Sequence, residues 1–100
     1  MTQWYNTTGF MSDTLAKKYG ALVVVGEHRY FGKSKPFGED SYAKGNNQFF
    51  NLENILMDNA RLIEHVRKKY DAENQPVVVF GGSYSGMVAT WLRMKFPNLV

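Results

Sequence analysis

The sequence contains no cysteine and only three prolines, and no apolar run approaches the roughly 20 residues that a membrane-spanning helix needs. A membrane span is therefore not expected. The lack of cysteine leaves the cellular compartment open, because disulfides could lie in other parts of a longer protein. Hydrophobic residues make up 44% and aromatic residues 15% of the chain, which is the composition of a folded protein. One hundred residues is short for an α/β enzyme, so we expect a single partial domain over residues 1–100 of something longer.

Nothing in the charge pattern indicates a nucleic-acid partner. The net charge is +3, and the basic residues are spread along the chain. Their largest cluster, residues 67–69, falls at the expected C-terminus of a helix, where cations interact favourably with the helix dipole. The N-terminal residues show no signal peptide. The Asn6-Thr7-Thr8 tripeptide matches the N-glycosylation sequon, which matters only in a secreted protein.

The first half of the chain predicts a helix, a strand and a long loop. Ser12 or Asp13 can cap a short helix that runs through Lys18 and is ended by Gly20. Residues 21–25 follow as a continuous β-branched run, which is typical of a parallel strand buried on both faces. Residues 31–50 carry scattered glycine, proline and asparagine, and they predict a surface loop anchored by Tyr42, Phe49 and Phe50.

The second half predicts two helices around a second strand. Asn51 can cap a helix over residues 52–70, whose apolar side chains recur at three- and four-residue steps. Residues 77–80 form a second apolar run, and residues 87–96 a final helix that ends before Pro97. Strand, crossover helix and strand in this order indicate a parallel, right-handed α/β unit.

The most informative segment is the glycine-rich turn that follows the second strand. It reads Gly81-Gly82-Ser83-Tyr84-Ser85-Gly86 and leads directly into a helix, which is the context of a nucleophile elbow. In such a turn the residues two before and two after the nucleophile must be small. Gly81 and Ser85 meet that condition around Ser83, and the Tyr84 amide would then donate one oxyanion-hole hydrogen bond.

Ser85 is a poorer nucleophile candidate, because its own flanking positions would be Ser83 and the bulky Met87. The usual pattern is G-x-S-x-G, and Ser85 stands here in place of its last glycine. A phosphate-binding turn is the alternative, but neither G-x-G-x-x-G nor a Walker lysine is present. We predict no metal and no cofactor.

A nucleophilic serine needs a general base, normally a histidine oriented by a carboxylate. His28 and His65 both precede Ser83, whereas this fold places the acid and the histidine after the serine. We therefore interpret both as structural or solvent-facing side chains, and we expect the triad acid and base outside this chain.

Three ordered blocks resemble the S28 family of serine peptidases, which contains post-proline carboxypeptidases and dipeptidyl peptidases. The blocks are Glu27 to Ser34, Pro36 to Gly38 and Gly81 to Gly86, and weaker likeness over Asn6 to Phe10 and Trp91 to Pro97 extends it across nearly the whole chain. The resemblance implies an α/β-hydrolase fold, a Ser-Asp-His triad, an acyl-enzyme mechanism and peptide substrates with proline at the cleavage position. It also implies a lysosomal or secreted glycoprotein.

The resemblance places several parts of the enzyme outside residues 1–100, including the acid, the histidine, the helical cap and a strand between the two predicted here. We therefore expect the two strands either to leave a gap or to pair directly, and in both cases to expose apolar surface. The isolated chain should lack peptidase activity and a cooperative melt. Two alternatives stay open, a non-catalytic truncated product and an esterase or lipase that uses the same elbow.

Overall fold

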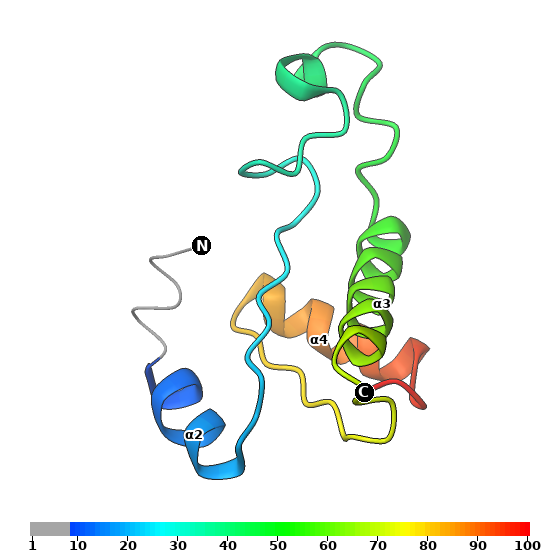
Figure 1. The fold of residues 1–100 in the computed structure, drawn as a ribbon. Helices are drawn as coiled ribbons and strands as arrows, with labels where there is room; N and C mark the ends of the chain where they lie inside the picture. Colours follow the sequence, from blue (N-terminus) through cyan, green and yellow to red (C-terminus); the bar gives the residue numbers. More distant parts are fainter. Residues whose placement is uncertain (1–8) are drawn as a thin grey trace.

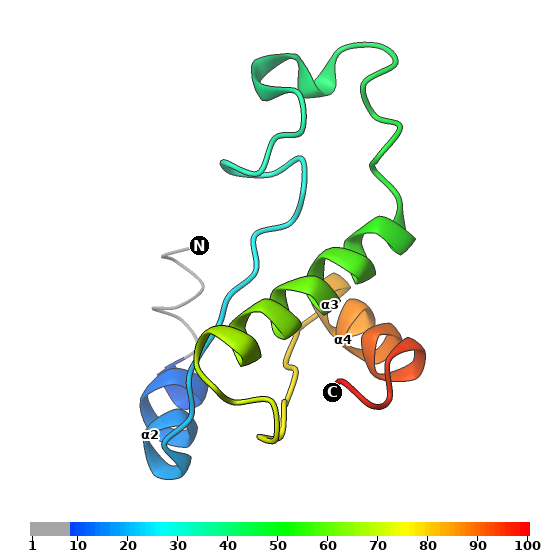
Figure 2. The same cartoon turned by 45° about the vertical axis from the view of Figure 1, so that its right-hand side comes forward.

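The computed structural model describes residues 9–100, which form four helical segments and a long loop in an elongated arrangement of 47 × 30 × 26 Å (Figure 1). The sequon residue Asn6 lies outside the described residues. Figure 2 shows α3 and α4 crossing side by side, with the loop reaching away from them. Within the described part of the chain, no helix is long and apolar enough to cross a membrane.

The first helical segment begins earlier than the sequence predicts. A π-helix, η1 (Phe10–Leu15), leads into a single α-helical turn, α2 (Ala16–Tyr19). Gly20 ends the segment in the left-handed conformation at φ 59°, as predicted. The predicted caps are wrong, because Ser12 and Asp13 lie inside η1, whose N-cap position is Gly9.

The longest helix, α3 (Leu52–Lys69), confirms the predicted capping and periodicity. The Asn51 side chain accepts a hydrogen bond of 2.9 Å from the Asn54 amide, and the basic residues 67–69 occupy the last turn. Ile55, Leu56 and Ala60 are buried, all in the first half of the helix. No residue in the second half of the helix, 61–69, is buried.

The last helix, α4 (Tyr84–Lys95), starts three residues before the predicted Met87 and packs against α3. Its buried residue is Leu92. Lys95 Nζ lies 2.6 Å from Glu53 Oε1, and this exposed ion pair joins the end of α4 to the start of α3. Its hydrogen bond and charge lower the pKa of Glu53. The contribution of the pair is therefore present at neutral pH and is lost as the pH falls through the lowered pKa.

The two predicted strands are extended segments that no sheet joins. Figure 1 shows the first running from α2 to the loop and the second leading into α4. Among residues 9–100 there is no assigned strand, and no backbone hydrogen bond links residues 21–25 to residues 77–80. Their apolar side chains are consequently exposed, at 59% for Leu22 and 70% for Val78. The exposed apolar surface is as the sequence predicts and the two segments do not pair directly, while the gap between strands and the partial α/β-hydrolase fold stay predictions.

The long loop between the first extended segment and α3 contains one short 3-10 helix, η2 (Gly38–Tyr42). Ser41 is fully buried there, accepting from the Phe37 amide at 3.0 Å and donating to the Gly38 carbonyl at 2.8 Å. The Tyr42 hydroxyl donates to the Tyr30 carbonyl. These bonds give the loop a defined course although it has little regular structure.

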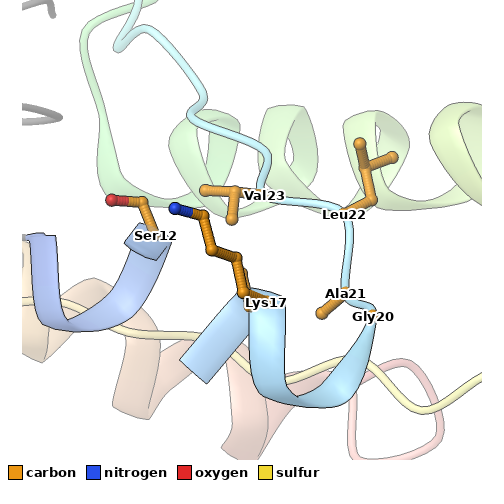
Figure 3. A pocket seen from close by; sticks show the side chains of 7 residues that line it. Ser12, Lys17, Gly20, Ala21, Leu22 and Val23 are labelled. Atoms are coloured by element: carbon orange, nitrogen blue, oxygen red, sulfur yellow. The ribbon is translucent and has the colours of Figure 1, made fainter. Parts of the chain in front are cut away.

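A shallow hollow of about 420 Å³ lies between the first helical segment and the extended residues that follow it. Figure 3 shows Ser12, Lys17 and Val23 around it. The Ser12 hydroxyl is buried there without a hydrogen-bond partner among the described residues. The hollow borders the exposed first extended segment, and we assign it no chemical role.

Candidate active site

Ser83 stands at the junction between the second extended segment and α4. Its backbone has φ 52° and ψ −125°, a sparsely populated conformation that costs a non-glycine residue on the order of 1–3 kcal/mol. Its side chain does not cap the helix, and the residue is exposed. The strained turn therefore presents the hydroxyl to the surface and leaves it free of the α4 amides.

The chain crosses itself closely on either side of Ser83. A Cβ added at Gly81 would lie 2.2 Å from the Ser85 carbonyl oxygen and 2.3 Å from its carbon, so only glycine fits there. At Gly86 an added Cβ would lie 3.1 Å from the Gly81 oxygen, whereas at Gly82 it would meet nothing within 4 Å. The crossing thus involves Gly81, Ser85 and Gly86, and available space does not require a glycine at position 82.

The N-terminus of α4 presents backbone amides beside Ser83. The first amides of a helix have no partner within it, and the helix dipole favours negative charge at this end. The amides of Gly86 and Met87 both donate to the Ser83 carbonyl, at 3.0 and 3.1 Å. The amide that directly follows Ser83 is that of Tyr84. This arrangement suits the stabilisation of an oxyanion on a group bonded to the Ser83 oxygen.

His28, at the end of the first extended segment, lies against the first residue of α4. Its Nε2 is 3.0 Å from the Tyr84 hydroxyl, and its Nδ1 is 2.6 Å from the Arg29 carbonyl oxygen. Both ring nitrogens are therefore engaged by groups other than Ser83. This agrees with the interpretation of His28 as a structural side chain, and His65 is exposed on α3.

Arg29 joins the same segment to α3. Its Nε and Nη2 donate to the two carboxylate oxygens of Asp58 at 2.6 and 2.7 Å, and its Nη1 donates to the Phe49 carbonyl at 3.1 Å. The bidentate bond to Asp58 raises the pKa of Arg29. The Arg29 guanidinium therefore joins the end of the first extended segment to α3 and to the loop at Phe49.

Replacing Arg29 with methionine should lower the free energy of unfolding of the full-length protein by about 1–2 kcal/mol, a value reduced because the Asp58 side chain is 41% exposed. A denaturant titration measures it. Lys35→Met is the matched control, since its 3.4 Å pair with the 95% exposed Glu39 should contribute less than about 0.5 kcal/mol. Equal losses in the two variants would contradict the role assigned to Arg29.

Glu27 and Tyr30 flank His28 and Arg29 in the sequence, and both side chains make hydrogen bonds to the loop that follows. The Glu27 carboxylate accepts a hydrogen bond of 2.9 Å from the Lys33 amide, and a Cβ at Gly32 would lie 2.1 Å from its Oε1. Tyr30, only 2% exposed, has φ 71° and donates from its hydroxyl to the Asn46 carbonyl at 2.6 Å. The block that begins at Glu27 therefore has a separate neighbour for each of its first four side chains.

An open pocket of about 440 Å³ borders the elbow. The His28 ring contacts Phe31 edge-on at 5.1 Å between centroids, and it lies 5.7 Å from the rings of both Phe50 and Tyr84. Apolar side chains from α3 and α4 complete the wall of the pocket. The lining residues are His28, Phe31, Phe50, Asn51, Leu52, Ile55, Tyr84 and Trp91.

Within residues 9–100, no cluster of three or more acidic or histidine side chains is placed to hold a metal ion.

Sequence reasoning located the turn but missed the side chains that hold it. The bond between His28 and Tyr84 spans 56 positions, and the pair of Arg29 with Asp58 spans 29, so no spacing rule connects them. The sequence signal for His28 and Arg29 is the block from Glu27 to Ser34, which marks the family resemblance but gives no physical role for each residue.

A serine at a strained turn, between an extended apolar segment and a helix N-terminus, with glycine where the chain crosses itself, is the arrangement found in serine hydrolases of the nucleophile-elbow type. Residues 2–100 match the family described as Serine carboxypeptidase S28. The chain belongs to this family.

Several curated relatives support the assignment. Lysosomal Pro-X carboxypeptidase from Homo sapiens is 47% identical over 100 residues, covering 97% of this chain and 20% of that protein. The Mus musculus protein of the same name is also 47% identical with the same coverage. Prolyl carboxy peptidase like protein 5 from Caenorhabditis elegans is 40% identical, covering 93% of this chain and 19% of that protein. The chain thus spans about a fifth of the length of these relatives.

Proposed function

We propose that the full-length protein containing this chain is a serine-type exopeptidase that cleaves after proline, with Ser83 as its nucleophile. The observation that carries the proposal is the strained backbone of Ser83 at the start of α4, in a chain of the S28 family. The names of the Pro-X carboxypeptidases support the proline preference and a lysosomal location. A secreted location is compatible with the same proposal.

The Ser83 hydroxyl attacks the carbonyl carbon of the scissile bond, and its proton passes to a histidine outside this chain, because both nitrogens of His28 are engaged and His65 is exposed. The carbonyl oxygen becomes an oxyanion beside the Tyr84 amide. Expulsion of the amine, which takes up that proton, leaves an acyl-enzyme on Ser83, and water then hydrolyses the ester. Gly81, Gly82, Ser85 and Gly86 provide the turn that allows this exposure.

The fold that suits this chemistry is the α/β-hydrolase fold, in which residues 21–25 and 77–80 become parallel strands. Their β-branched composition and exposed apolar side chains support this proposal. Strands supplied by other parts of the full-length protein would cover that surface.

The substrate proposal is tested with two tripeptides of the same sequence, X-Pro-Y. The first has a blocked amino end and a free carboxyl end, and the second has a free amino end and an amidated carboxyl end. A carboxypeptidase releases Y from the first, and a dipeptidyl peptidase releases X-Pro from the second. Replacing the proline with alanine should reduce turnover of either peptide, and equal turnover of proline and alanine peptides would contradict the proposal.

A further inference from the structure

The hydrogen bond between His28 and the Tyr84 side chain connects the end of the first extended segment to the residue that directly follows the proposed nucleophile. We infer that these two side chains form a positioning pair that holds the Tyr84 amide beside Ser83. This inference rests on the proposed function, since it assigns the pair to the oxyanion donor of that reaction.

The direction of the bond follows from the neighbours of the imidazole. The Arg29 carbonyl can only accept, so the Nδ1 of His28, 2.6 Å away, carries the proton. In the neutral ring Nε2 is then an acceptor, and the Tyr84 hydroxyl donates to it at 3.0 Å. The Arg29 carbonyl thus selects the tautomer whose Nε2 accepts a hydrogen bond from the Tyr84 hydroxyl.

The histidine is itself held in place from two sides. Its ring packs edge-on against Phe31 and lies against Phe50, and the next residue, Arg29, is fixed by its two bonds to Asp58. Ring orientation and backbone position are both constrained before the tyrosine is considered. His28 therefore provides a fixed point, to which the first turn of α4 is tied by the tyrosine.

Apart from the backbone crossing with Gly81 and the amides bonded to the Ser83 carbonyl, the start of α4 lacks a side-chain cap. Ser83 gives no side-chain cap, and its backbone is in a strained conformation that surrounding contacts must maintain. An oxyanion donor is effective only within a narrow range of positions, and small displacements lower kcat more than they raise KM. The Tyr84 hydroxyl restrains the same residue whose amide makes that contact.

The test uses the full-length protein with a prolyl peptide substrate. Tyr84→Phe keeps the ring contacts and removes the hydroxyl, so kcat should fall about threefold to tenfold with KM unchanged. His28→Leu should give a similar fall, and the double variant should be no worse than either single one, because both changes break one interaction. His28→Gln, which keeps an acceptor for the hydroxyl, should restore most of kcat.

Tyr42→Phe is the matched control, because its hydroxyl bonds to the Tyr30 carbonyl in the loop and does not reach the elbow. It should leave kcat unchanged. An unchanged kcat in Tyr84→Phe, or losses that multiply in the double variant, would overturn the inference.

A second readout separates this inference from the proposed function. Amide hydrogen exchange at Gly86 and Met87, whose amides bond to the Ser83 carbonyl, should be several-fold faster in Tyr84→Phe and in His28→Leu than in the Tyr42→Phe control. If the unmodified protein turns over substrate no faster than its Ser83→Ala variant, the proposed function fails, yet faster exchange still supports the positioning pair. Unchanged exchange overturns the pair whatever the activity.

Discussion

Replacing Ser83 with alanine should reduce kcat of the full-length protein on a prolyl peptide by on the order of 10⁶-fold. The reason is that no other hydroxyl at the turn has the same exposed, strained position. Alanine is the suitable replacement because it keeps a Cβ and so does not relax the backbone at φ 52° as glycine would. Steady-state kinetics on purified protein measure the loss.

Ser85→Ala is the matched control for this experiment. Ser85 lies in the same turn, and its backbone forms part of the crossing with Gly81, but its hydroxyl has no assigned role. Its activity should stay within about tenfold of the unmodified protein. A Ser85→Ala variant that loses activity while Ser83→Ala keeps it would exchange the two assignments.

Replacing Gly81 with alanine should destabilise the protein by about 3 kcal/mol or more and lower its activity at least about hundredfold. The added Cβ would lie 2.2 Å from the Ser85 carbonyl oxygen, which is backbone and cannot swing aside as a flexible side chain can. Relief of this contact requires the extended segment and α4 to separate, and that displaces Ser83. Thermal unfolding and kinetics together measure both effects.

Gly82→Ala provides a control one residue away. A Cβ there meets nothing within 4 Å, so the change in stability should be within about 0.5 kcal/mol. If the alanine variants at positions 81 and 82 are equally stable and equally active, the close crossing of the elbow does not exist in the folded protein.

Local features were predictable from the sequence because they depend on a few adjacent residues. The Asn51 cap, the left-handed Gly20 and the basic last turn of α3 all follow from the preferences of helix ends. The tight turn at Ser83 was predictable for a related reason, since it depends on glycine and small residues next to one serine, between an apolar run and a helix.

Two predictions of helix boundaries were wrong: the N-terminal cap of the first helical segment and the first residue of α4. Ser12 and Asp13 are good capping residues, but the helical segment continues through them as a π-helix, and Ser12 is buried inside it. The sequence predicts that the last helix starts at Met87, after the glycine-rich turn. Gly86 instead lies in the first turn of the helix, against the Gly81 oxygen.

Long-range features could not be derived from spacing. A β-branched run predicts a strand, but a strand exists only when a neighbour accepts its hydrogen bonds, and residues 21–25 and 77–80 have no such neighbour among residues 9–100. Likewise, His28 and Tyr84 are hydrogen-bonded across 56 positions, and no sequence spacing predicts that contact. The resemblance marked the block around His28 without explaining it.

The most direct test of the central claim is to treat the full-length protein with a fluorophosphonate, which phosphonylates activated serine hydroxyls, and to locate the adduct by peptide mass spectrometry. We expect one stoichiometric adduct on Ser83 and none in Ser83→Ala. An adduct on Ser85 or elsewhere in the protein, or equal labelling of the Ser83→Ala variant, would contradict Ser83 as the nucleophile.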